Sequence, residues 1–259
     1  MVDTISHIRM AALTKHCLPA TKPSPEEMFP IYQELLPRPR VKALVKGAGV
    51  KLYWRLLTPL VVMWLMIYQR LNSDRTCDEV VSHLHSGAMD AFDRTDEPRE
   101  PLSKRLTSES SSAYVQGRNR LPLSVLIGAL QHVAAAIDGW LRPGGVPQAR
   151  WKGHSVRLLD GTTHRLKPVG DLVETYGQAK NQHGDSHWVI AKSVVAFNLF
   201  TQAVVAYAEG AGEKRETSFV RLVMAADPVS DSLYLADRGF GIYVVAQVAE
   251  YGKKRWCSV

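Results

Sequence analysis

Apolar side chains recur every three or four residues along the first part of the chain, the spacing of helices that bury one face. Ser24, followed by Pro25 and two glutamates, is typical of a capped helix start, and Pro37 ends that helix. Helical spacing resumes over residues 41–90, where Thr58 precedes a proline and indicates a new helix start. This part of the chain is therefore predicted to be a set of short packed helices.

The helical pattern continues to about residue 145. Residues 93–112 are rich in charge, proline and serine, which predicts a surface linker, and Leu121 to Leu141 forms a second helical block opened by Pro122. The most apolar stretch, Pro59 to Tyr68, has about half the length of a bilayer span and is interpreted as a buried helix, so no membrane association is expected. We predict an arm over residues 1–25 and an all-helical domain over residues 26–145.

A different pattern begins after Trp151. β-Branched and apolar runs predict strands, and two stretches between or after them have helical spacing. The expected strands cover residues 156–159, 188–198, 203–208 and 232–236, the expected helices residues 213–226 and 243–250, and the closing residues look like another strand. The predicted class is a multidomain α+β protein, in which the all-helical domain precedes an α/β domain over residues 151–259.

Composition narrows the class of partner. The 259 residues are 46% hydrophobic, enough for a folded core, and 32 basic against 25 acidic residues give a net charge of +7. A polyanion is therefore the electrostatically favoured partner. The three cysteines are far apart and lack metal-binding spacing, so neither a disulfide framework nor a zinc site is expected, and a reducing, cytoplasmic compartment fits best.

Two aspartates stand at matching places in two apolar strands. Asp160 follows Val-Arg-Leu-Leu and Asp237 follows Leu-Tyr-Leu-Ala, so each is expected at the carboxyl end of its strand, where α/β sheets place ligands. Carboxylates from neighbouring strands can share Mg²⁺, and two such ions can drive an in-line phosphodiester displacement. Gly161 and Gly239 would let a nucleic-acid backbone approach. The simpler alternative is that each aspartate only caps a turn or a helix.

These segments resemble a known family. Leu158-Leu-Asp160-Gly-Thr-Thr163, the Gly177 to Gly184 region with His183, and Leu233-Tyr-Leu-Ala-Asp237-Arg-Gly-Phe240 are similar to the DDE transposases of bacterial insertion sequences, specifically the insertion sequence four type. Ser112-Ala-Tyr-Val-Gln-Gly-Arg-Asn-Arg-Leu-Pro122 looks like the segment that joins the helical and catalytic domains of these proteins.

The resemblance implies an RNase H-like catalytic domain that binds Mg²⁺ (or Mn²⁺), with Asp160 as the first metal-binding catalytic acid and Asp237 as the second. It implies DNA partners, namely transposon ends and target, a homo-oligomer and a bacterial, nucleoid-associated location. The family's third acid lies in a Tyr-x₂-Arg-x₃-Glu-x₆-Lys signature, which the remaining residues lack; Glu250 does not match it. We therefore expect a partial RNase H-like domain in a C-terminally truncated chain that binds DNA without strand transfer.

Two alternatives stay open at the level of sequence. One is a metal-dependent nuclease that uses only the acids present, and the other is an inactive DNA-binding fragment that regulates a full-length transposase. Candidate DNA contacts are Arg38, Arg40, Lys42 and Lys46 in the helical domain, with Lys51 and Arg55 further along the same basic cluster, and Arg238 beside the second acid. A solvated helix face explains the first four equally well, and a local ion pair would explain Arg238.

Overall fold

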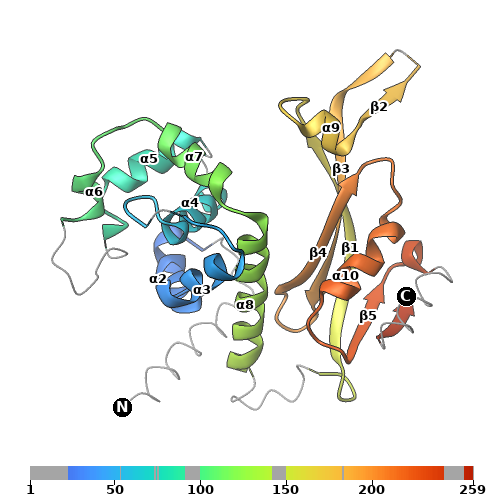
Figure 1. Ribbon diagram of the computed structural model, residues 1–259. Coiled ribbons are helices and arrows are strands. Elements are labelled where there is room, and N and C mark those ends of the chain that lie inside the picture. The colour runs from blue at the N-terminus through green and yellow to red at the C-terminus, as the bar shows by residue number, and fades with distance from the viewer. Residues whose placement is uncertain are drawn as a thin grey trace. The chain divides into compact units, whose positions relative to one another are not determined.

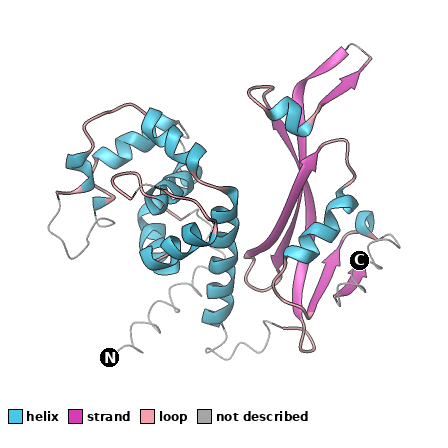
Figure 2. Cartoon of the chain, in the orientation of Figure 1, coloured by secondary structure: helices cyan, strands magenta, loops and turns pink. Residues whose placement is uncertain are grey.

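A computed structural model describes residues 23–52, 54–72, 74, 76–90, 100–141, 150–182, 184–241 and 254–258. It is an α+β protein with a helical N-terminal region followed by a mixed sheet with interleaved helices (Figures 1 and 2). The chain divides into two compact units, residues 1–133 and 134–259, and the division falls inside the last long helix.

The first unit is built from short helices, as the apolar spacing predicts. They are α2 (Pro25–Leu35), α3 (Arg38–Gly47), α4 (Pro59–Leu71), α5 (Cys77–His85), α6 (Leu102–Arg105), α7 (Ser112–Arg120) and the first part of α8 (Leu123–Leu141). The expected start of α2 is confirmed, because Ser24 and Glu27 form a reciprocal capping box. Thr58 caps α4 by accepting a hydrogen bond from the backbone N–H of Val61.

Helix α4 forms the centre of the helical core. Trp64 is 1% exposed, and its ring lies 5.0 Å from that of Phe29 and 5.3 Å from that of Tyr32. The hydroxyl of Tyr32 donates a 2.7 Å hydrogen bond to the Leu60 carbonyl, so the aromatic contact between α2 and α4 also has a polar anchor. The prediction that the most apolar stretch is a buried helix is confirmed.

One prediction in this unit is wrong in part. Residues 102–105, expected in a surface linker, form α6, and Leu102 is 1% exposed within the helical core. One buried leucine among charged residues gives no periodic signal, so only packing reveals the turn. Residues 93–99 of the expected linker, and the arm as far as residue 22, lie outside the described residues.

Among the described residues, no single helix is long and apolar enough to cross a bilayer. Helices α7 and α8 reach the required length and composition only as a pair, and they meet at an angle of 79°.

The second unit contains a six-stranded mixed sheet in which β1 is central. Its strands are β1 (Ser155–Leu166), β2 (Gln178–Asn181), β3 (Gly184–Asn198), β4 (Val204–Ala211), β5 (Ser232–Ala236) and β6 (Arg255–Ser258). Strand β1 pairs antiparallel with β3 and parallel with β5; β3 pairs antiparallel with β2 and β4, and β5 pairs parallel with β6. The strand expected in the closing residues is confirmed as β6, whereas the expected helix over residues 243–250 lies outside the described residues.

The expected end of β1 at residue 159 is wrong. The strand runs on to Leu166 because β3 continues to pair with it, from Asn198 opposite Arg157 down to Val189 opposite Leu166. Asp160 therefore lies inside β1. What ends at Leu159 is the parallel pairing with β5, whose last residue Ala236 lies opposite Leu159.

Helices cover one face of this sheet. The 3₁₀ turn η3 (Glu216–Phe219) runs into α10 (Val220–Ala226), and α9 (Leu172–Tyr176) follows β1 along the chain. Figure 1 shows α10 lying along the sheet. The core on this face consists of the apolar residues Leu159, Val194, Ala196, Ala206, Ala208, Phe219, Val220, Val223, Met224, Tyr234, Ala236 and Phe240. Helix α10 thus fills the connection from β4 to β5, as parallel strands require.

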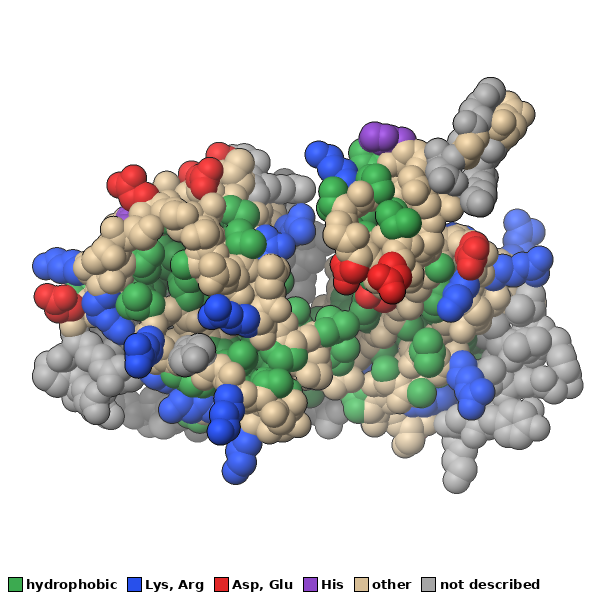
Figure 3. Space-filling model, turned by 45° about the horizontal axis from the view of Figure 1, so that its top comes forward, with side chains coloured by type: hydrophobic (Ala, Val, Ile, Leu, Met, Phe, Trp, Pro, Cys, Tyr) green, Lys and Arg blue, Asp and Glu red, His purple; other side chains and the backbone are tan. Residues whose placement is uncertain are grey.

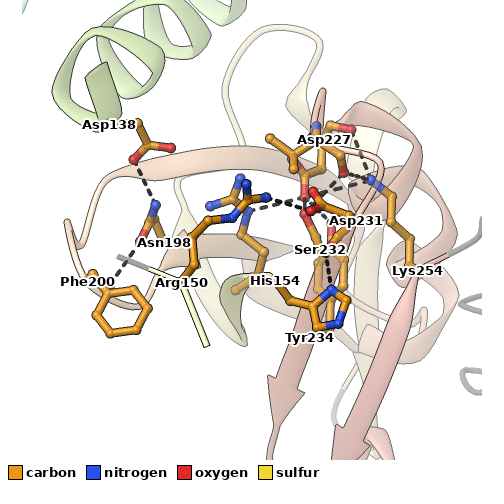
Figure 4. A network of polar contacts seen from close by, with 12 residues as sticks. Asp138, Arg150, His154, Asn198, Phe200, Asp227, Asp231, Ser232, Tyr234 and Lys254 are labelled. Carbon is orange, nitrogen blue, oxygen red and sulfur yellow. Dashed lines mark hydrogen bonds and ion pairs between the residues drawn. The ribbon is translucent and has the colours of Figure 1, made fainter. Parts of the chain in front are cut away.

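A buried polar network holds β5 against β1 (Figure 4). Asp227, directly after α10, accepts hydrogen bonds from Ser232 and Tyr234 of β5, both at 2.7 Å, and lies 3.3 Å from the Arg157 guanidinium of β1. The Asp227 and Arg157 side chains are 0% and 1% exposed. The Lys254 ammonium lies 4.0 Å from the same carboxylate. Strands β1 and β5 and the residue just before β6 therefore share one buried carboxylate.

Burial opposes the ionisation of Asp227, but the Arg157 guanidinium and the Ser232 and Tyr234 hydroxyls outweigh it and hold the pKa of this carboxyl below its usual value. A lowered pKa contributes stability that is present above the unfolded value of about 3.9 and is lost as the pH falls through the folded value.

Replacing Asp227 should test this network. Asp227→Ala leaves Arg157 as a buried, uncompensated charge, and we expect the free energy of unfolding to fall by about 3–5 kcal/mol, measured by urea denaturation. Asp231→Ala is the matched control, because its ion pair with Arg150 is 45% exposed on both sides and should contribute about 0–1 kcal/mol. Equal losses of unfolding free energy in Asp227→Ala and Asp231→Ala would contradict the assigned role. We also expect the stability of Asp227→Asn to depend less steeply on acid pH than that of the unsubstituted chain, and an equally steep dependence would contradict the role as well.

Candidate metal centre and nucleic-acid interface

The register of β1 and β5 brings Asp160 and Asp237 together. The last parallel pair is Leu159 with Ala236, so these two acids are the next residues on adjacent strands. The backbone of Asp237 is still extended (φ −68°, ψ 174°), and partners in matched register point to the same face of a parallel pair. Neighbouring strands lie about 4.8 Å apart, which lets the two carboxylates face one space.

Each of these carboxylates is held by a local hydrogen bond. Oδ1 of Asp160 accepts from the backbone N–H of Gly161, and Oδ1 of Asp237 accepts from that of Gly239, both at 2.9 Å. Both side chains are exposed, and their Oδ2 atoms accept no hydrogen bond from the described part of the chain. Asp237 thus does cap the 3₁₀ turn η4 (Arg238–Phe240), as the simpler explanation requires, but one oxygen of each acid is left over.

Oxygen donors of this kind fit Mg²⁺ or Mn²⁺, which accept carboxylates and keep water or phosphate in the other positions. No group of three or more His, Cys, Asp or Glu residues within the described ranges could hold a metal ion. Two carboxylates alone would therefore leave most of the coordination sphere to water and to a phosphate-bearing ligand.

A third carboxylate, which sequence reasoning missed, packs on the backbone next to Asp160, but on the face of the sheet opposite to the Asp160 side chain. A Cβ built on Gly161 would lie 2.3 Å from the Glu216 carboxylate, so this carboxylate packs directly on the backbone next to Asp160. Glu216 begins η3, on the helix-covered face, and accepts no hydrogen bond from the described residues. Gly161 therefore makes room for a side chain of its own chain. Only the path of η3 over the sheet reveals this, because 56 positions separate Glu216 from Asp160 in sequence.

One other polar residue near the first acid has a structural partner. Nε2 of His164 lies 2.8 Å from Oγ of Ser193, a contact between β1 and β3. Arg165 is exposed further along β1, and His183 lies outside the described residues. Arg238 is exposed directly after Asp237, and the described residues contain no ion pair between the two.

Four of the basic residues predicted to contact DNA in the helical domain belong to α3, and Lys51 and Arg55 follow this helix. Arg38, Lys42 and Lys46 are spaced by four residues and so share one side of this helix, whereas Arg40 lies on another. Arg38 and Lys42 place their charged groups 5.8 and 5.6 Å from the centre of the Trp54 ring. Part of this charge therefore packs on an aromatic side chain of the same unit.

The charge on α3 opposes the helix dipole. Its first turn carries Arg38 and Arg40 and no acidic residue, and Pro37 at the N-cap position provides no side-chain hydrogen bond. Cations at a helix N-terminus are unfavourable for the helix but favourable for a bound anion. Figure 3 shows Lys and Arg side chains distributed over the helical part of the molecule.

No protein-family model and no curated protein matches this chain.

The contact between Gly161 and Glu216 can be tested by a double-mutant cycle. Gly161→Ala forces the flexible end of Glu216 aside, and we expect it to lower the free energy of unfolding by about 1 kcal/mol, with the loss reduced in a Glu216→Ala background. Gly212→Ala is the control, because its Cβ would lie 2.6 Å from the Ile190 carbonyl oxygen and no truncation at position 216 can relieve that clash. Additive effects of Gly161→Ala and Glu216→Ala would contradict the contact.

Proposed function

We propose that this chain is a metal-dependent DNA transposase of the DDE type with an RNase H-like catalytic domain, in which Asp160 and Asp237 are two of the catalytic acids. The observation that carries the proposal is their matched register at the point where β1 and β5 part. A sheet whose central strand is antiparallel to one neighbour and parallel to the other, with an acid on each parallel strand, is what the resemblance leads us to expect.

The chemistry proposed for this site follows from the two free carboxylate oxygens. Asp160 and Asp237 would hold Mg²⁺ or Mn²⁺, which when bound activates the attacking hydroxyl and stabilises the leaving oxygen of a phosphodiester. The sheet fixes the backbone of Asp160, and Asp237 follows β5 directly as the N-cap of η4. The hydrogen bonds from Gly161 and Gly239 fix one oxygen of each acid, so the remaining oxygens are oriented before a ligand arrives. Arg238 is close enough in sequence to the second acid to contact a phosphate.

The DNA-binding part of the proposal rests on charge. The uncapped first turn of α3, with its two arginines, is costly for the helix and suited to a phosphate. The exposed Lys42 and Lys46 extend the positive charge along α3. Transposon ends and target DNA are the proposed ligands, bound by a homo-oligomer.

A second candidate function is a metal-dependent nuclease that uses only acids within the described residues. The observation that favours it is that Asp160 and Asp237 each keep one carboxylate oxygen that accepts no hydrogen bond from the described residues, so these two acids can act without a third. The two candidates differ in their products, because the nuclease nicks DNA in Mg²⁺ and the transposase also joins a 3′ hydroxyl to a second duplex. Nicking without joining that is lost in Asp160→Asn would favour the nuclease.

Metal binding should depend on both aspartates. Mn²⁺ at one hundred times its Kd should stabilise the chain by about 2.7 kcal/mol, measured as a rise in Tm, and Asp160→Asn or Asp237→Asn should remove the rise. Without metal both variants should be at least as stable as the unsubstituted chain, because each removes one of two neighbouring like charges. Asp231→Asn, on the surface at the other end of β5, is the control and should keep the metal response. A rise in Tm that survives in both Asn variants would refute the assigned site.

DNA binding and helix stability should respond in opposite directions at Arg40. Arg40→Glu places a favourable charge in the first turn of α3, so stability should rise by about 0.3–1 kcal/mol. The affinity for a fluorescent duplex should fall roughly tenfold at low salt, with a shallower salt dependence. Glu34→Gln adds no positive charge to α3 and serves as a control for a neighbouring exposed position. Unchanged DNA affinity in Arg40→Glu would remove α3 from the interface.

A further inference from the structure

The helical unit contains a cavity that the proposed function does not use. Its volume is about 760 Å³, within the range of small-molecule sites. It lies between the segment after α3, the start of α4, the end of α6 and helix α7. Its apolar walls include Leu52, Leu56, Leu57, Val62 and Leu106.

The polar groups around this cavity are basic. Lys51, Arg55, Arg105 and Arg120 line it, and the described residues of its lining include no carboxylate. Lys51, Arg55 and Arg120 are exposed, and Arg105 donates a 3.1 Å hydrogen bond to the Arg55 carbonyl, which ties α6 to the opposite wall. Arg120 donates to Gln116 one turn earlier in α7. Four cations around one opening create a positive potential that favours an anion.

We propose that this cavity binds a small amphipathic anion, an organic phosphate with an apolar body. The apolar walls would bury the body and the basic residues would bind the phosphate, with Arg55 and Arg120 suited to bidentate contacts. A DNA phosphate backbone needs the cations but has no use for an apolar cavity, so a small ligand accounts for both features. The proposal is independent of the metal centre.

The requirement for both an apolar body and a phosphate group can be tested with 1-naphthyl phosphate, using isothermal titration calorimetry on the full chain. We expect 1-naphthyl phosphate to bind at least about tenfold more tightly than 1-naphthol, which lacks the phosphate, and than inorganic phosphate, which lacks the naphthyl group. Lys51→Gln with Arg55→Gln should remove the advantage over 1-naphthol. Lys104→Gln, an exposed cation of α6 that does not line the cavity, is the matched control and should bind normally.

Filling the cavity with a large side chain tests whether the ligand binds there. Ala113 lines it from the exposed side of α7, so Ala113→Trp should abolish binding of 1-naphthyl phosphate while leaving Tm unchanged. Asp160→Asn should bind as the unsubstituted chain does, which separates this result from the metal centre. Equal affinities for 1-naphthyl phosphate and inorganic phosphate, or no binding by the properly folded chain, would overturn the proposal. If Ala113→Trp no longer bound a DNA duplex but still bound 1-naphthyl phosphate, the proposal would also be overturned. The cavity would then belong to a nucleic-acid-binding surface.

Discussion

The buried ion pair between Asp227 and Arg157 is the constraint on which the geometry of the sheet depends. A charge at 0% or 1% exposure is tolerated only with a partner, and this pair also engages two hydroxyl groups of β5. A shift of β5 by one residue along β1 would turn Ser232 and Tyr234 to the other face, so the carboxylate would lose both hydroxyl hydrogen bonds. The network therefore sets which residues of the two strands lie side by side.

The pairing of the two acids follows from that register. Because Leu159 lies opposite Ala236, Asp160 and Asp237 come next on the two strands, one at the point where pairing stops and the other at the start of a 3₁₀ turn. A stable buried network at one end of β5 thus fixes a pair of exposed like charges at the other end. The Asp227 network stabilises the fold because its polar groups are paired. Asp160 and Asp237, in contrast, each keep one carboxylate oxygen for a ligand.

In the helical unit, too, the residues that stabilise the fold differ from those that carry the exposed charge. Its interior is organised around Trp64 and the capped helices α2 and α4, whereas α3 carries cations at the end where the helix dipole opposes them. Of the basic residues around the apolar cavity, Lys51, Arg55 and Arg120 are exposed. Both features are understandable as binding surfaces for anions, of which DNA is one kind and a small organic phosphate another.

The sequence by itself determined the class of each unit. Capping residues at Ser24 and Thr58 fixed two helix starts, and alternating β-branched runs identified β3, β4 and β5, because these signals are local. Matching local patterns also singled out Asp160 and Asp237. Only the tertiary structure decided the features that depend on residues far apart in the sequence. The length of β1 depends on β3, the short helix α6 depends on the burial of Leu102, and Glu216 reaches Gly161 because η3 crosses the sheet. The cavity with its basic rim likewise joins residues 50 to 121, and no local pattern could have brought them together.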